Sequence, residues 1–263
     1  WIEEKLNEYM NELLKTKDVD YVIASDTDSV YIRFDELVEK FKPKNPVDFL
    51  DTIAKEKVEP FINKVYKELA DYTKAFEQKM QMKREVIADK GIWTAKKRYI
   101  LNAYDVEGVR YKEPKLKIMG IEAVKSSTPA PCRENIKQAL RIIMDGDEKE
   151  LNTFIQNFRK KFLTLAPEDV AYPRGVNGLS KWTESHNLFK KGAPIHVKGA
   201  ILYNHLIKKN KLGYKYPLIQ EGDKIKFLHM KLPNIYQSSS ISFITKLPKE
   251  ISFAVDYDLQ FEK

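Results

Sequence analysis

The chain has 263 residues, which is enough for one large domain or two of ordinary size. It is 43% hydrophobic and 11% aromatic, so it can build a sizeable core, and the composition argues against a disordered protein. No stretch approaches the roughly 18 uninterrupted apolar residues of a membrane span, and no signal peptide is visible. Cys132 is the only cysteine, which excludes an internal disulfide and a cysteine zinc cluster and favours a reducing, cytoplasmic setting.

Charge is distributed unevenly along the chain. Residues 1–95 carry a net charge of −4 and residues 96–263 one of +12, which together give the overall +8. The stretch 181–215 contains eight lysines and one acid, Glu184, with aromatic residues among the lysines. Lysines interleaved with aromatics favour a phosphate-lined partner such as a nucleic acid, although a solvated lysine-rich surface gives the same pattern.

The first elements are predicted from hydrophobic periodicity. Apolar residues recur at helical spacing over residues 2–16, which predicts an amphipathic helix. Two β-rich runs separated by a polar turn predict a hairpin over about 21–33. A long helical stretch is expected from Pro46 to about Gln81, with a kink or break at Pro60, because proline cannot complete the helical hydrogen-bond ladder.

Extended segments are predicted next, the second of them beginning just after Gly91. They cover residues 82–88, 93–103, 109–111 and 116–124. Two prolines and three hydroxyl residues then mark a boundary at 126–131.

Beyond this boundary the pattern becomes mainly helical. Helices are expected over 133–145 and 148–164, split at Gly146, and over 195–208, with a loop-rich stretch between them. Short strands are expected at 224–230 and 251–255. The sequence therefore predicts a mixed α+β fold. Its first part, 1–128, contains a β-hairpin with flanking helices, and its second part, 129–263, is mainly helical with short strands.

The turn of the first hairpin carries two carboxylates one residue apart, in the sequence Asp26-Thr27-Asp28. A hairpin tip is rigid and open, which suits a hard divalent cation that needs oxygen ligands and water. On this segment alone, an ordinary polar turn explains the residues equally well. An EF-hand calcium loop fits worse, because its third ligand and the glycine that follows it would fall on Val30 and Tyr31.

Further motifs accompany this turn. One places a carboxylate in a strand-like run, one places three cations before an aromatic residue, and two are lysine-containing stretches. In chain order they are Arg84–Ala88, Trp93–Tyr99, Glu113–Pro129 and Pro194–Asn204. With Asp26–Ser29, this order closely resembles the C-terminal part of family B DNA polymerases, and within them the replicative polymerases of large tailed bacteriophages. The resemblance spans essentially the whole chain and is strongest over 21–129.

The resemblance implies a function for the acids. Asp28 would be a ligand of two catalytic magnesium ions, Asp26 would lie nearby, and Glu85 would help to order the metal site. Thr27, between the two aspartates, would lie at the nucleotide. The implied enzyme is a DNA-directed DNA polymerase that transfers a deoxynucleotidyl group from a dNTP to a primer 3′ end. Two ions about 4 Å apart would stabilise the attacking and leaving oxygens of that reaction.

The resemblance also implies DNA contacts. Lys96, Lys97, Arg98 and Tyr99 match a motif that holds the primer end and the minor groove, where every base pair offers an acceptor. Other cations and hydroxyls would track the duplex phosphates at the base of a thumb domain. These are Lys115, Lys117, Lys125, Ser126, Ser127 and Lys198. In isolation, a basic strand end explains Lys96–Arg98 and a linker explains Ser126–Pro129.

The family carries another metal-binding aspartate, a finger helix and an exonuclease domain upstream of the region that matches. Residues 1–128 would therefore be the C-terminal part of a palm domain and residues 129–263 the thumb. We expect an incomplete catalytic unit that needs the upstream polymerase segment, from the same parent chain or from a separate split chain. A tail that docks on a sliding clamp is not visible. For a phage enzyme, the host cytoplasm is the expected location, without a membrane partner.

Two alternatives stay open from the sequence. The chain could be a non-catalytic scaffold that binds duplex DNA. It could also be a metal-binding hairpin protein unrelated to DNA, although this alternative leaves Lys96–Tyr99 unexplained.

Overall fold

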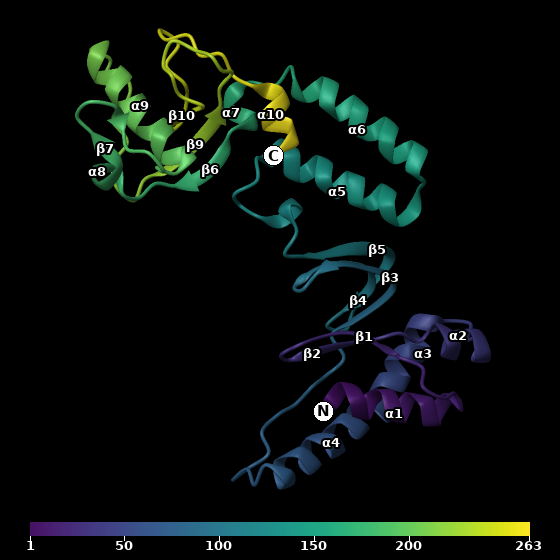
Figure 1. The fold of residues 1–263 in the computed structure, drawn as a ribbon. Helices are drawn as coiled ribbons and strands as arrows, with labels where there is room; N and C mark the ends of the chain where they lie inside the picture. Colours follow the sequence, from purple (N-terminus) through teal and green to yellow (C-terminus); the bar gives the residue numbers. More distant parts are fainter. The chain divides into compact units, whose positions relative to one another are not determined.

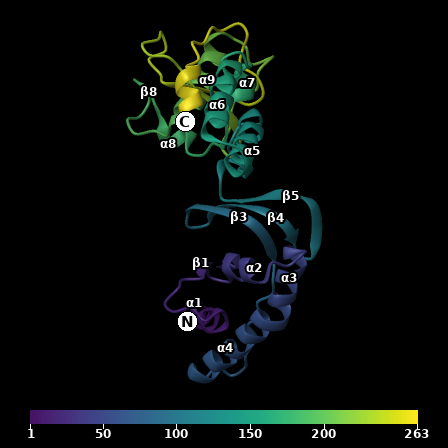
Figure 2. The same cartoon turned by 90° about the vertical axis from the view of Figure 1, so that its right-hand side faces the viewer.

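The computed structural model describes all residues from 1 to 263. The chain forms two compact units, unit 1 from Trp1 to Met119 and unit 2 from Gly120 to Lys263. Figures 1 and 2 show the helices and the small antiparallel sheets within each unit. The mixed α and β composition confirms the predicted fold class. None of the helices combines the length and the apolar composition that are needed to cross a bilayer.

Unit 1 begins with a set of helices around one hairpin. In chain order, its first elements are α1 (Ile2–Leu14), β1 (Val22–Asp26), β2 (Ser29–Ile32), α2 (Asp35–Phe41), α3 (Pro46–Ile53), the π-helical turn η1 (Ala54–Val58) and α4 (Glu59–Tyr72). The apolar stripe of α1 buries Leu6 against Val58 and Ile62, and Met10 against residues beside the hairpin. The side chain of Asn7 accepts hydrogen bonds from the backbone N–H groups of Tyr21 and Val22, at 2.8 and 2.9 Å. These contacts fix the start of the hairpin on α1.

The long helix predicted from Pro46 is interrupted and is shorter than expected. It begins at Pro46, where the side chain of Asn45 caps its first backbone N–H groups. The break lies in η1, which ends two residues before Pro60, because proline has no N–H and its ring crowds the preceding turn. The helix ends at Tyr72 rather than near Gln81, and residues 73–85 contain neither helix nor strand.

A three-stranded antiparallel sheet completes unit 1. Its strands, in the order β3-β4-β5, are β3 (Val86–Ala95), β4 (Arg98–Val106) and β5 (Val109–Met119). The predicted break at Gly91 is wrong, since β3 runs through it and turns only at Lys96 and Lys97. A Cβ at Gly91 would lie 2.7 Å from the Trp93 ring and 2.8 Å from Leu101. The glycine therefore serves close packing rather than a turn.

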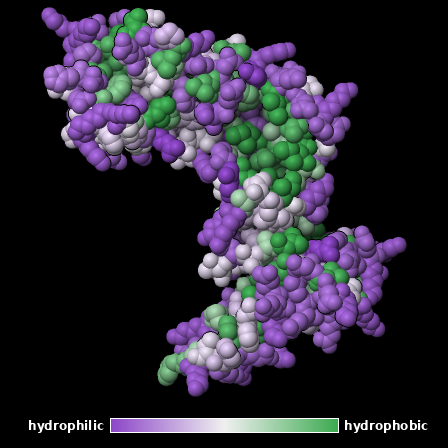
Figure 3. Space-filling model, in the orientation of Figure 1, coloured by the Kyte–Doolittle hydropathy of each residue, from purple (hydrophilic) through white to green (hydrophobic).

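Unit 2 starts with a helical hairpin. After the 3-10 turn η2 (Glu122–Val124), α5 (Ala130–Asp145) and α6 (Glu148–Phe162) form as predicted, separated at Gly146. The pair buries Leu140 and Phe162 but leaves Ile143 and Ile155 more than 40% exposed. On the face drawn in Figure 3, apolar residues gather over this part of unit 2.

The core of unit 2 is built around one buried helix, α9 (Ile195–Lys209). It packs on β10 of a three-stranded antiparallel sheet whose order is β10-β9-β6. The strands are β6 (Tyr172–Gly175), β9 (Lys224–His229) and β10 (Ser240–Phe243), and the remaining short elements are α7 (Pro167–Val170), α8 (Leu179–Trp182), β7 (Thr183–Glu184), β8 (Leu188–Phe189) and α10 (Tyr257–Glu262). The strand predicted over 251–255 is wrong, because only Val255 forms a bridge, with Met230.

Candidate functional site

The acidic tip of the first hairpin is a two-residue turn. Asp26 pairs with Ser29, and Thr27 and Asp28 lie between them. Thr27 adopts a left-handed backbone conformation with φ of 34°, which is uncommon for a β-branched residue. The backbone N–H of Asp28 donates to the carbonyl oxygen of Asp26, and Thr27 Oγ1 donates to the Asp26 carboxylate at 3.2 Å. The Asp26 carboxylate is therefore hydrogen-bonded within the turn, whereas Asp28 is exposed.

Asp28 and Glu85 share a cavity, although 57 positions separate them in the chain. The cavity has a volume of about 200 Å³, lies within unit 1, and is lined by both residues and by Lys117. Lys117 Nζ lies 2.5 Å from Glu85 Oε1, whereas the Asp28 carboxylate has neither an ion pair nor a hydrogen bond to another side chain. Apolar residues, among them Val58 and Ile87, also line the cavity. The structure therefore brings together two of the three predicted acids.

Asp26 belongs to a different contact. Its carboxylate lies 3.6 Å from Lys97 Nζ and does not line the cavity. The structure gathers no group of three or more acidic, histidine or cysteine side chains that could hold a metal ion. Carboxylate oxygens are the ligands that hard cations prefer, so Asp28 and Glu85 fit a divalent cation as a partial ligand set that water and other oxygens would complete.

Three aromatic side chains join the acidic hairpin to the basic one. The Tyr31 ring centroid lies 5.3 Å from that of Trp93 and 5.2 Å from that of Tyr99, both in edge-on geometry. Burial, assisted by the hydrogen bond with Tyr99, raises the pKa of Tyr31 to about 12. Such pairs add about 0.5–1.5 kcal/mol beyond their buried area. The cluster thus fixes β2 on β3 and β4 and sets the separation of the two tips.

The basic residues of the motif Trp93–Tyr99 surround a tight turn. Ala95 pairs with Arg98, so Lys96 and Lys97 form the tip, and Lys97 has a left-handed φ of 60°. Both lysines are exposed. Tyr99 points back into the aromatic cluster and lines the cavity. Sequence analysis placed these residues inside a strand, whereas the structure presents the two lysines on a projecting turn.

Two lysines of β5 have specific partners. Lys115 Nζ lies 4.2 Å from the centroid of the Tyr111 ring, which is a cation–π contact. Lys117 reaches Glu85, as described above. Residues two apart on a strand lie on the same face, so both lysines extend from one side of the sheet.

The remaining predicted contact residues belong to unit 2. Lys125 pairs with Glu122 at 2.9 Å, and Ser126 and Ser127 follow it in the segment before α5. Lys198, on the first turn of α9, lies 5.8 Å above the Phe189 ring.

Lys198 also lines an open groove of unit 2, of about 1060 Å³. Other basic side chains line the same groove, and sequence analysis detected them only as part of a lysine-rich stretch. They are Lys190, Lys191, Lys208, His186 and His205.

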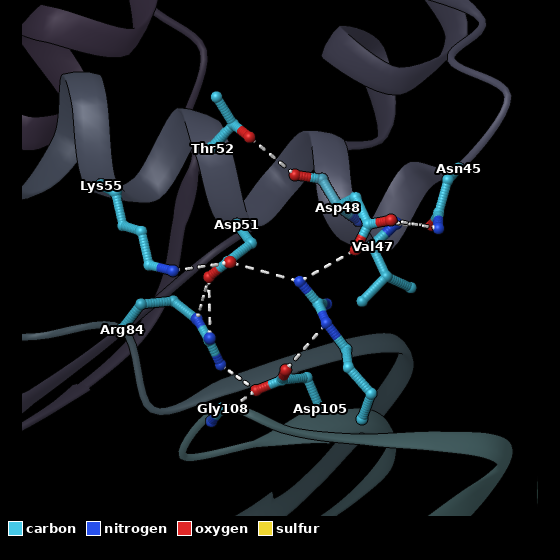
Figure 4. Close-up of polar contacts among 10 residues, drawn as sticks. Asn45, Val47, Asp48, Asp51, Thr52, Lys55, Arg84, Asp105 and Gly108 are labelled. Carbon is cyan, nitrogen blue, oxygen red and sulfur yellow. Dashed lines mark hydrogen bonds and ion pairs between the residues drawn. The ribbon is translucent and has the colours of Figure 1, made fainter.

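A buried charge network lies directly beside Glu85, and sequence analysis did not find it. Figure 4 shows Arg84 between the carboxylates of Asp51, on α3, and Asp105, near the end of β4. Arg110, at the start of β5, lies within 3.2 Å of both acids. Asp105 is fully buried, and its Oδ1 also accepts the backbone N–H of Gly108 at 3.0 Å. Hydrogen bonds from Lys55 and then Arg84 lower the pKa of Asp51.

No family model matches the chain. The chain is 35% identical to the DNA-directed DNA polymerase of Enterobacteria phage T4 and 36% identical to that of Escherichia phage RB69, over 283 aligned positions in each case. Each alignment covers 100% of this chain and 31% of the relative, so the chain spans less than a third of the length of these polymerases. The resemblance stated from the motifs is thereby confirmed. The chain is homologous, over its whole length, to a segment of the DNA-directed DNA polymerases of these two phages.

Proposed function

We propose that this chain is the palm and thumb part of a family B DNA polymerase, and that it takes part in template-directed transfer of deoxynucleotides to a primer 3′ end. The observation that carries the proposal is the convergence of Asp28 and Glu85 on one cavity, joined through Tyr31, Trp93 and Tyr99 to the basic tip. This arrangement occurs in a chain that aligns over its full length with two DNA-directed DNA polymerases. We assign residues 1–128 to the palm and residues 129–263 to the thumb.

The acids have the proposed role of holding magnesium. Asp28 is the main ligand, since it is exposed and its carboxylate makes no hydrogen bond or ion pair with another side chain. Glu85 is held by Lys117 at 2.5 Å, and Asp26 by Lys97 at 3.6 Å, so each is kept in place by an ammonium group. When bound, two magnesium ions would neutralise the charge that develops on the phosphate oxygens during transfer. Thr27, whose hydroxyl braces Asp26, has the proposed role of lining the nucleotide site.

The proposed DNA contacts fall into two sets, the first around the lysine turn of unit 1 and the second divided between β5 of unit 1 and residues of unit 2. Lys96, Lys97, Arg98 and Tyr99 are assigned to the primer end and the minor groove, supported by the exposed lysine tip. The other assigned residues track duplex phosphates, and they are Lys115, Lys117, Lys125, Ser126, Ser127 and Lys198. The proposed ligands are primer–template DNA and a dNTP. The chain acts with the upstream polymerase segment, in the host cytoplasm, and a sliding clamp is a further candidate partner.

Primer extension tests the proposal. We expect no extension by the 263-residue chain alone, because it supplies only a partial ligand set, and magnesium-dependent extension when it is mixed with the remainder of its parent polymerase. Asp28→Ala should reduce the rate in the mixture by at least about a thousandfold, whereas Lys64→Ala, on the exposed face of α4, should not change it. Template-directed extension by the chain alone would refute the incomplete-unit proposal. An active Asp28→Ala mixture would refute the role of Asp28.

The second candidate is a scaffold that binds duplex DNA without contributing to chemistry, and the basic groove of unit 2 favours it. Both candidates predict that duplex affinity falls with salt, since each phosphate contact releases counterions. Replacing Lys96 and Lys97 together by alanine should reduce the slope of log K against log salt by about 2. Fluorescence anisotropy with a labelled duplex measures this slope, with Lys64→Ala as the matched control. Tight binding together with an inactive mixture would favour the scaffold, and a flat salt dependence would exclude phosphate tracking.

A further inference from the structure

The segment before β3 needs an anchor to place Glu85. Residues 73–85 contain neither helix nor strand, and the strand pairing of β3 with β4 begins only at Val86. Glu85 therefore stands at the junction of an irregular segment and a sheet. Its side chain is exposed and its only ion pair is with Lys117. Regular structure alone does not determine where the carboxylate points.

Arg84 supplies this anchor from both its backbone and its side chain. Its backbone N–H donates to Glu59 Oε1 of α4 at 2.8 Å. Its guanidinium reaches Asp51 Oδ1 through Nε and Nη2, at 3.0 and 2.7 Å, and Asp105 Oδ1 through Nη1. The Arg84 side chain is only 11% exposed, and it joins α3 to the end of β4.

The next residue is tied to the same sheet edge. The carbonyl oxygen of Glu85 accepts the backbone N–H of Glu107 at 2.6 Å, in the turn that Asp105 stabilises through Gly108. The side chain of Arg84 extends into the charge network while that of Glu85 extends to Lys117 and the cavity. Any rotation of the backbone at Arg84 therefore moves the Glu85 carboxylate.

We propose that Arg84, clamped between Asp51 and Asp105, is a positioning residue that aims Glu85 at a cation site shared with Asp28. The inference rests on the proposed function, because it presumes that this cavity binds a divalent cation. A planar guanidinium group that contacts two acids fixes the orientation of the arginine side chain, and a lysine ammonium group cannot reproduce that orientation. Groups that orient metal ligands in this way typically change metal affinity by about 10–100-fold when they are replaced.

Terbium luminescence tests the inference without polymerase activity. Tb³⁺ is a hard cation, and excitation of Tyr31 and Tyr99, which line the cavity, sensitises its emission. Titration of the full 263-residue chain with Tb³⁺, with Mg²⁺ as competitor, gives an affinity for each variant. We expect Asp28→Asn and Glu85→Gln each to weaken binding. Arg84→Lys should weaken it by about tenfold, and Lys55→Gln, which touches Asp51 but not Arg84, by less than about twofold.

A double-variant cycle separates positioning from a general loss of structure. In a Glu85→Gln background, Arg84→Lys should have no further effect on Tb³⁺ affinity, because the carboxylate that it orients is gone. Asp51→Asn removes the charge of the carboxylate that Arg84 contacts through Nε and Nη2, and it should change Tb³⁺ affinity in the same way as Arg84→Lys. The test therefore does not depend on the folding of a single variant. An equal loss of affinity in both backgrounds, or no loss in Arg84→Lys, would overturn the inference. If Asp28→Asn and Glu85→Gln leave binding unchanged, the proposed metal site itself fails.

Discussion

Replacing Asp105 by alanine is expected to lower the free energy of unfolding by about 3–5 kcal/mol, since it removes the fully buried member of the two acids that Arg84 and Arg110 share. Asp105 is fully buried, accepts from Arg84 and the Gly108 backbone, and lies 3.2 Å from Arg110 Nε. Its removal leaves the mostly buried Arg84 side chain with Asp51 as its remaining acidic partner. Urea denaturation followed by circular dichroism measures the loss.

The matched control is an arginine–aspartate pair at the surface of the same unit. Asp35 lies 3.6 Å from Arg33, and its side chain is 57% exposed. Exposed pairs contribute about 0–1 kcal/mol, so Asp35→Ala should change stability by no more than that. Similar losses of unfolding free energy for the two variants would show that water reaches the network and that burial does not increase the contribution of Asp105 to stability.

Gly199→Ala is expected to destabilise unit 2 by about 2–3 kcal/mol, although alanine is the better helix former. Gly199 lies on α9 where the helix meets β10. A Cβ there would lie 2.6 Å from Ser242 Oγ, 2.7 Å from Ser242 N and 2.8 Å from Ile241 C. Two of these are backbone atoms of β10, so they cannot rotate away as a side chain could. The displacement would also strain the hydrogen bond from Ser242 Oγ to the carbonyl oxygen of His196.

Gly213 provides the control for this substitution. A Cβ at Gly213 would meet no heavy atom within 4 Å, and its backbone does not adopt a positive φ. Gly213→Ala should therefore raise the free energy of unfolding by no more than about 1 kcal/mol, because alanine reduces the conformational entropy of the unfolded chain. Urea denaturation of the two variants gives the comparison. A Gly199→Ala chain as stable as Gly213→Ala would mean that α9 can move off β10 at little cost.

Local chemistry predicted several elements correctly. The hairpin with Asp26 to Ser29 at its tip formed because alternating apolar residues flank a short polar turn, and both signals lie within a dozen residues. The α5 and α6 helices formed with their division at Gly146, because glycine ends a helix and Asp147 caps the next one. These elements depend on neighbours in the chain, which the sequence displays directly.

The failures of prediction arose where packing overrides local preference. Residues 73–81 have a helical composition, yet α4 ends at Tyr72, and the Phe76 side chain that would have continued its apolar face is fully exposed. Gly91 suggested a break, but its missing side chain makes room for Trp93 and Leu101. At Gly91 the deciding contact includes Leu101 on the paired strand β4, and a local sequence pattern does not show which strand will pair.

The sequence by itself determined the order of motifs, the acidic tip and the homology to phage DNA-directed DNA polymerases, because each depends on residue identity along the chain. Only the tertiary structure decided that Asp28 and Glu85 share a cavity, that Asp26 instead faces Lys97, and that Arg84 lies between Asp51 and Asp105. Arg84 is 33 residues from Asp51 and 21 from Asp105. Contacts over such separations form only when the folded core brings the segments together, since no local pattern encodes which distant charge a buried arginine will meet.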